Sequence, residues 1–126
     1  MREIKFRAWD EETKQLLIVN SLTLDFGLCD LWNGKPEDEG VAKKLSDVNL
    51  MQYTGLKDKN GVEIYESDVV KFNFIGREEG TSEVKWEYGE WNVTDFSEKV
   101  RISDNIHEAA DIEVIGNIYQ NPELLI

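Results

Sequence analysis

The chain has 126 residues, 40% of them hydrophobic, and its 26 acidic and 14 basic side chains give a formal net charge of −12. This length fits one domain, and the hydrophobic share excludes a chain that is disordered throughout. A charge this negative disfavours nucleic-acid binding, because contact with a phosphate backbone depends on Lys and Arg.

Apolar and polar residues alternate over residues 4–9, which predicts a first strand. A polar turn at 10–14 and a second strand at 15–19 complete a hairpin. Residues 21–26 alternate again and form either a third strand or an extension of the second. We therefore expect N-terminal strands within residues 3–26.

After residue 26 the alternation stops. Asn33-Gly34 and Pro36 favour loops. The sequence predicts one long surface loop over residues 27–47, with a helical turn at 41–45. The lone cysteine, Cys29, cannot form an internal disulfide, and we interpret it as a partly buried thiol.

Asn60-Gly61 lies between two apolar segments, residues 50–56 and 62–65. Both residues tolerate the positive φ that a tight primed turn needs, so we expect a hairpin here. A corner at 66–68 then leads into a further strand at 69–74.

The same turn superficially resembles a calcium loop, through Asp58, Asn60, Gly61 and Glu63. Too few oxygen ligands precede Gly61, and the flanks have the pattern of strands rather than helices. We therefore favour a plain hairpin turn.

The last third of the chain predicts a second hairpin at 81–96 and a final strand at 112–118. Ser103 can cap a short helix over 104–110. Asn121 and Pro122 predict a helical turn that closes the chain at 121–126.

Three blocks of sequence extend over nearly the whole chain: IKFRAWD at residues 4–10, YTGLKDKNG with IYESDVV at 53–61 and 64–70, and VIGNIY with NPELL at 114–119 and 121–125. In these blocks, and in their order, the chain resembles the YopX family of phage and prophage proteins. The resemblance implies a small, mainly β protein with an SH3-like barrel, and it assigns no catalytic or cofactor residue. The family usually has Gly where this chain has Ser67, so a corner that needs positive φ would strain Ser67.

Many short strands separated by turns favour an antiparallel sandwich or barrel over a parallel sheet. We expect a single domain, 1–126, that is mainly β: a small antiparallel SH3-like barrel or an open sandwich with one long loop and short helical segments. Its barrel core would cover residues 48–120.

Catalysis has little support in the sequence. His107 is the only histidine, and no nucleophile motif accompanies it. With Asp104, Glu108 and Asp111 it could ligate a metal at helical spacing, but that set lacks a second His or Cys. Glycine-rich phosphate loops are absent. We predict no enzyme, no cofactor and no metal site, and interpret His107 as a solvated surface residue.

Aromatic residues provide the candidate binding site. Trp86, Tyr88 and Trp91 surround the predicted turn of the second hairpin. Alternation puts Trp86 on the same face as Val84 and Tyr88, so core packing is one interpretation. The other is an exposed cluster that binds a peptide or bases, and these three are the candidate partner-binding residues.

The resemblance to the YopX family, the acidic charge and the missing catalytic motifs together imply a phage- or prophage-encoded, non-catalytic protein-interaction module that contacts a host or phage protein. Residues 76–126 contain 12 acidic and 4 basic residues. This surplus either keeps the chain dispersed or meets a basic partner. The alternative is a nucleic-acid-associated barrel in phage DNA metabolism or regulation, which would use the aromatics with Arg2, Lys5 and Arg7.

Compartment and assembly follow from what the chain lacks. No apolar run approaches the roughly 20 residues that cross a bilayer, and the N-terminus has no signal-peptide core. We expect no membrane contact and a location in the cytoplasm of the bacterial host cell. Edge strands leave a homo-oligomer open.

Overall fold

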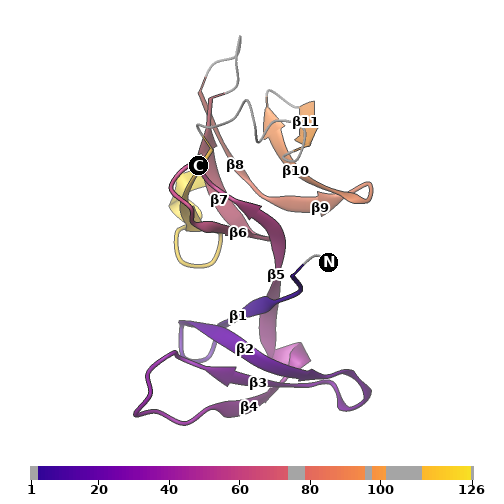
Figure 1. Cartoon of the computed structure of the whole chain (residues 1–126), viewed down its shortest axis with the longest axis vertical. Coiled ribbons are helices and arrows are strands. Elements are labelled where there is room, and N and C mark those ends of the chain that lie inside the picture. Colours follow the sequence, from indigo (N-terminus) through magenta and orange to yellow (C-terminus); the bar gives the residue numbers. More distant parts are fainter. Residues whose placement is uncertain (1–2, 74–78, 96–97, 102–111, 126) are drawn as a thin grey trace. The chain divides into compact units, whose positions relative to one another are not determined.

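The computed structural model describes residues 3–73, 79–95, 98–101 and 112–125 (Figure 1). The chain divides into two compact units, residues 1–52 and 53–126. Both are built from antiparallel strands, which confirms the prediction of a mainly β protein. In the described part of the chain, no helix is long and apolar enough to cross a membrane.

Unit 1 is a twisted antiparallel sheet in the order β4-β3-β2-β1-β5. Its elements are β1 (Phe6–Asp10), β2 (Gln15–Thr23), the 3₁₀ helix η1 (Leu24–Phe26), β3 (Leu28–Trp32), β4 (Val41–Lys44), the 3₁₀ helix η2 (Leu45–Asp47) and the first half of β5 (Val48–Lys57). The core residues of this unit are Ala8, Leu17, Cys29, Leu31 and Val48.

The predicted loop over residues 27–47 is wrong, because two strands within it, β3 and β4, pair in the sheet. β3 pairs with β2 and β4 pairs with β3, with Leu31 opposite Val41. Cys29 and Leu31 are buried, while the residues that alternate with them, Leu28 and Asp30, are exposed. Burial therefore alternates with the period of two that a strand has. The sequence pattern does not show this clearly, because one buried position is a cysteine and one exposed position is a leucine. The predicted helical turn at 41–45 is likewise wrong, since its first residues form β4.

Unit 2 contains the second half of β5, its partner β6, and two three-stranded sheets in the orders β12-β7-β8 and β11-β10-β9. The elements after β5 are β6 (Glu63–Tyr65), β7 (Asp68–Phe72), β8 (Gly80–Glu83), β9 (Lys85–Glu87), β10 (Glu90–Asp95), β11 (Glu98–Arg101), β12 (Glu113–Asn117) and the 3₁₀ helix η3 (Pro122–Leu125). The core combines Ile64, Val70, Phe72, Val84, Trp91, Val93 and Ile112.

Among the described residues these sheets do not close on themselves, so an SH3-like barrel is not confirmed. The helical turn predicted at the end of the chain is present as η3. The helix predicted over 104–110 lies outside the described residues.

The turn between β5 and β6 differs from the predicted primed turn. Only Gly61 has positive φ, at 81°, whereas a primed turn would need it at Asn60 as well. Asp58 holds the turn instead: its Oδ1 accepts the N–H groups of Asn60 at 2.8 Å and Val62 at 2.9 Å. Its Oδ2 accepts the N–H of Val114 in β12 at 2.9 Å. One carboxylate thereby fixes the turn and joins it to a distant strand.

The corner before β7 has the strain that the sequence suggested. Ser67 adopts φ 70°, in the left-handed region that disfavours side chains with a Cβ. Its N–H donates to the Val84 carbonyl at 2.9 Å, and its own carbonyl accepts the Ile118 N–H at 3.0 Å. Ser67 thus keeps an unfavourable conformation because both of its peptide groups are bonded.

Candidate functional site

The β9–β10 hairpin holds the three residues that the sequence singles out. Glu87 pairs with Glu90 and Trp86 pairs with Trp91, which leaves a two-residue turn. Tyr88 and Gly89 in that turn have φ 55° and 76°. Positive φ at both positions is the signature of a type I′ turn, whose twist matches that of the strands. The structure therefore places the primed turn here rather than at Asn60-Gly61.

The buried side-chain amide of Asn92 braces the hairpin next to its turn. Nδ2 of Asn92 donates to the carbonyls of Glu87 at 2.9 Å and Glu90 at 3.1 Å, which flank the turn. These bonds satisfy backbone acceptors on both sides of the turn with one side chain. The residues at the tip are therefore presented in a fixed geometry.

Trp86 and Trp91 lie on one face of the hairpin, since residues directly opposite each other in a sheet share a face. Trp91 is 7% exposed and belongs to the core, whereas Trp86 is 48% exposed. Their rings meet edge to face, with centroids 4.8 Å apart. Trp86 thus covers Trp91 and presents the rest of its own ring to solvent.

Tyr88 is 86% exposed at the tip of the turn. The three candidate residues therefore separate: Trp91 is a core residue, and Trp86 and Tyr88 form the exposed aromatic pair. The sequence placed Val84, Trp86 and Tyr88 on one face, but Val84 lies in the break between β8 and β9 and is fully buried.

The surroundings of this aromatic pair are acidic. Glu83, Glu87 and Glu90 accompany a single cation, Lys85, on the segment from β8 to the start of β10. Burial raises the pKa of Glu83, Lys85 opposes that shift, and the carboxylate of Glu66 adds to it. The raised pKa of Glu83 therefore reports mainly the burial of its carboxyl group.

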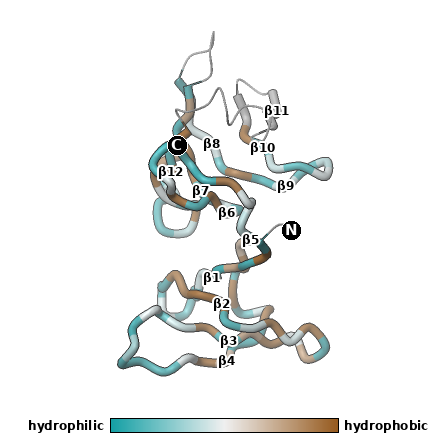
Figure 2. The backbone as a smooth tube through the Cα atoms, in the orientation of Figure 1, coloured by the Kyte–Doolittle hydropathy of each residue, from teal (hydrophilic) through white to brown (hydrophobic). Residues whose placement is uncertain are grey.

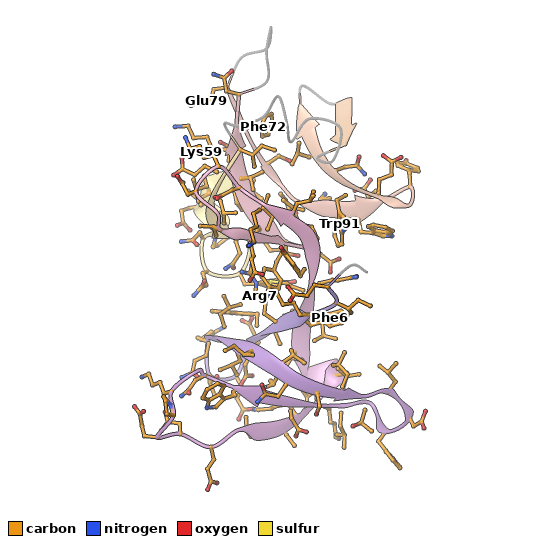
Figure 3. The ribbon with its side chains drawn as sticks, viewed as in Figure 1. Phe6, Arg7, Lys59, Phe72, Glu79 and Trp91 are labelled. Atoms are coloured by element: carbon orange, nitrogen blue, oxygen red, sulfur yellow. The ribbon has the colours of Figure 1, made fainter. Side chains whose placement is uncertain are left out.

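Within the described residues, each unit has a pocket away from the hairpin. In unit 2, a pocket of about 220 Å³ is lined by Lys59, Lys71, Phe72, Asn73, Glu79 and Glu113, three of which are labelled in Figure 3. Lys59 pairs with Glu113 at 3.6 Å and Lys71 with Glu79 at 3.4 Å. Because each ammonium has a carboxylate beside it, the pocket carries no surplus charge that would hold an ionic ligand.

In unit 1, a pocket of about 200 Å³ combines apolar walls from Leu17, Leu31 and Val41 with Asp10 and Lys43. Burial favours a higher pKa for Asp10, but bonds from the Thr13 hydroxyl and the Glu12 N–H, together with the Lys43 ammonium, outweigh it and lower the pKa. Asp10 is therefore an ionised structural residue of the β1–β2 turn.

The thiol of Cys29 has the wrong environment for a nucleophile. It is buried, and its Sγ lies 3.5 Å from the Lys43 carbonyl. Burial raises the pKa of Cys29, and the carboxylate of Asp30 raises it further. A thiol kept protonated in this way is unreactive.

No group of three or more His, Cys, Asp or Glu side chains suited to a metal occurs within the residues that the structure describes. Both oxygens of Asp58 already accept backbone N–H groups, which explains its position in the turn without calcium. His107, Asp104, Glu108 and Asp111 lie outside the described residues.

A model of the YopX protein family matches residues 5–126. The chain belongs to the YopX family. Among solved structures, this YopX-family chain is similar to protein EF1440 from Enterococcus faecalis, with 31% identity, a TM-score of 0.73 and full coverage of both chains. It also shares its fold with protein yopX from Bacillus subtilis, at 24% identity and a TM-score of 0.67, over 100% of this chain and 98% of that one. A search of curated proteins finds no match.

Proposed function

We propose that this YopX-family chain is a non-catalytic protein-interaction module of phage or prophage origin, and that its β9–β10 hairpin binds a basic segment of a host or phage protein. The observation that carries the proposal is the exposed pair of Trp86, on β9, and Tyr88, in the turn that follows it. Rigid aromatic side chains lose little entropy on binding and dominate many protein interfaces.

The charge of the hairpin selects the class of partner. Cations of Arg and Lys are attracted to the faces of Trp and Tyr rings, and more strongly where carboxylates stand nearby. Glu87 and Glu90 flank the turn directly, on the strands that carry it. A basic peptide segment therefore gains both a cation–π contact and charge complementarity, whereas an acidic segment gains neither.

A direct test uses three peptides of equal length, rich in Arg, in Lys and in Glu, with tryptophan fluorescence as the readout. The Arg peptide should bind saturably and more weakly as salt is added. Trp86→Leu should weaken its binding about fivefold or more, which corresponds to about 1 kcal/mol of cation–π attraction. Equal binding of the Glu peptide, or of the Trp86 variant, would overturn the proposal.

Tyr88→Asn is the matched variant, because it turns the tip into an Asn-Gly type I′ turn. It removes the exposed ring while keeping, or improving, the hairpin. We expect unchanged or higher stability together with weaker binding of the Arg peptide. Loss of binding through unfolding is thereby distinguished from loss of a contact.

The nucleic-acid alternative is tested in the same titration with a single-stranded oligonucleotide. Lys5 of the basic first strand pairs with Glu3 at 3.2 Å, which lowers the positive charge available there. Affinity capture from phage-infected host lysate, with and without nuclease, extends the test to cells. A protein captured by the wild type but not by Tyr88→Asn, and retained after nuclease treatment, supports the module; loss of all capture on nuclease treatment favours the alternative.

A further inference from the structure

A second exposed apolar group lies in unit 1, at the tip of the β2–β3 hairpin. Leu24 is 75% exposed and Phe26 is 78% exposed, both more than Trp86. Leu28, directly after them, is also exposed. In Figure 2 this tip is a brown segment at the end of the hairpin. This exposure could not be predicted from the sequence, since Leu22, Leu24 and Phe26 alternate as they would on one face of a strand.

The tip is held in one conformation by backbone bonds. Thr23 pairs with Leu28 and closes the hairpin across η1. Gly27, with φ 63°, donates its N–H to the Leu24 carbonyl at 3.2 Å. Its own carbonyl accepts the N–H of Leu45 in η2 at 2.8 Å. Leu24 and Phe26 thus project from a braced turn and not from a free loop.

Two large apolar side chains on a braced projection have the properties of anchors that enter a pocket on a partner. Ordering the tip costs little on binding, because the tip is already ordered. Asp25 lies between the two anchors in sequence and adds a carboxylate to the same turn.

The charge of the tip argues against a membrane as the occupant. Apolar anchors that enter a membrane surface usually come with Lys or Arg, which pair with anionic lipids. Here Asp25 would be driven into the interface, and the whole chain carries a net charge of −12. Both features repel an anionic leaflet.

A second copy of the chain is also disfavoured. The apolar pocket of unit 1 is bordered by Asp10 and Glu39, which would meet Asp25 with like charge. Its one cation, Lys43, already lies 2.7 Å from Glu12 and 3.5 Å from Asp10.

We propose that the η1 tip is a second docking site, for a partner protein whose apolar pocket has a Lys or Arg at its rim. Leu24 and Phe26 enter the pocket, and Asp25 pairs with the basic residue. This site does not depend on the β9–β10 hairpin, since it lies in the other unit.

Photocross-linking in cells tests the assignment. Phe26 is replaced by the photoreactive p-benzoylphenylalanine, which keeps an aromatic ring, and the full chain is irradiated in phage-infected host cells. A matched control carries the same residue at Glu37, in the exposed β3–β4 connection. We expect position 26, and not position 37, to cross-link a segment of another protein that contains apolar residues and a Lys or Arg. Cross-links to lipid, to this chain alone, or to nothing would overturn the proposal.

The cross-linked segment, made as a synthetic peptide, then gives the quantitative test. Leu24→Ser and Phe26→Ser should each weaken its binding about tenfold or more, as for hot-spot residues. Asp25→Asn should weaken binding less and flatten its salt dependence. Tyr88→Asn should leave the affinity unchanged, so failure of this site and failure of the hairpin site are separate results. If the Leu24 and Phe26 variants bound the peptide with the affinity of the wild type, the proposal would be contradicted.

Discussion

The indole rings of Trp86 and Trp91 meet across β9 and β10 with their centroids 4.8 Å apart and their planes at 67°. One ring belongs to the core of unit 2 and the other is half-exposed, so a single aromatic contact joins the core to the surface. A ligand that touches Trp86 therefore contacts a ring that packs on Trp91, a member of the same core cluster as Val84 and Val93. The packing of Trp86 on a core residue therefore holds its exposed ring in place.

The two tryptophans should differ sharply in their contribution to stability. Trp91→Ala should lower the free energy of unfolding by about 3–5 kcal/mol, because it opens a cavity in the core. Trp86→Ala should cost about 1 kcal/mol, mostly from the lost ring contact. Trp91→Phe should cost less than Trp91→Ala, because Phe keeps an aromatic ring in the core and leaves a smaller cavity. Both variants remove the indole N–H, which is buried without a partner in the described structure. Urea unfolding measures all three, and equal losses at positions 86 and 91 would contradict the packing.

Replacing Ser67 by Gly should stabilise the protein. The left-handed conformation costs a residue with a Cβ about 1–2 kcal/mol, and Gly removes that cost at the expense of a more flexible unfolded chain. We expect a net gain of about 0.5–1 kcal/mol in thermal or urea unfolding. Ser82→Gly, at a buried position in β8, serves as the control and should destabilise. A loss of stability in both variants would show that φ at Ser67 is not the controlling factor.

The carboxylate of Asp58 should stabilise the protein more than a typical turn residue does. Asp58→Ala removes the acceptor of three backbone N–H groups and should cost about 3 kcal/mol. Asp58→Asn keeps one acceptor oxygen, so its stability should lie between that of the wild type and that of Asp58→Ala. Hydrogen exchange of the Val114 amide should accelerate in both variants. Asp47→Ala, at an exposed position, is the control and should change stability by less than about 0.5 kcal/mol.

Asp10 should make unit 1 sensitive to acid. Its pKa is lowered in the folded state, so the unfolded chain binds the proton more readily. Its contribution is therefore complete above the ordinary pKa of Asp and is lost as the pH falls through the folded value. Thr13→Val should cost about 1 kcal/mol at neutral pH, and the difference from wild type should shrink in acid. Thr81→Val is the control, and a Thr13 effect that is independent of pH would contradict the assignment.

Local patterns in the sequence identified much of the fold. The alternation around β1, β2, β7 and β10 marks real strands, and the anomaly at Ser67 matches its left-handed φ. The prediction of a loop over 27–47 was wrong because β3 forms by pairing with β2 and β4, and only Cys29 and Leu31 in it face inward. Strand pairing of this kind depends on residues far apart in the chain, so a short stretch of sequence does not reveal it.

The candidate site shows the same limit more clearly. The sequence identified the right hairpin, but it could not separate Trp86 from Trp91, because both alternate equally well. Their difference depends on where the core of unit 2 ends. Leu24 and Phe26 were missed for a related reason: alternation predicts burial, and a 3₁₀ turn after Thr23 takes both residues out of the strand.

The bond between Asp58 and Val114 also has a consequence for synthesis of the chain on the ribosome. Unit 1 has all of its strand partners once β5 has emerged as far as Gln52. The turn at Asp58 gains its last partner only when Val114, 56 residues after Asp58 itself, has been added. Nascent chains can therefore complete the first unit while the second still exposes unpaired strands, and chaperones that hold nascent chains would meet the second unit for longer.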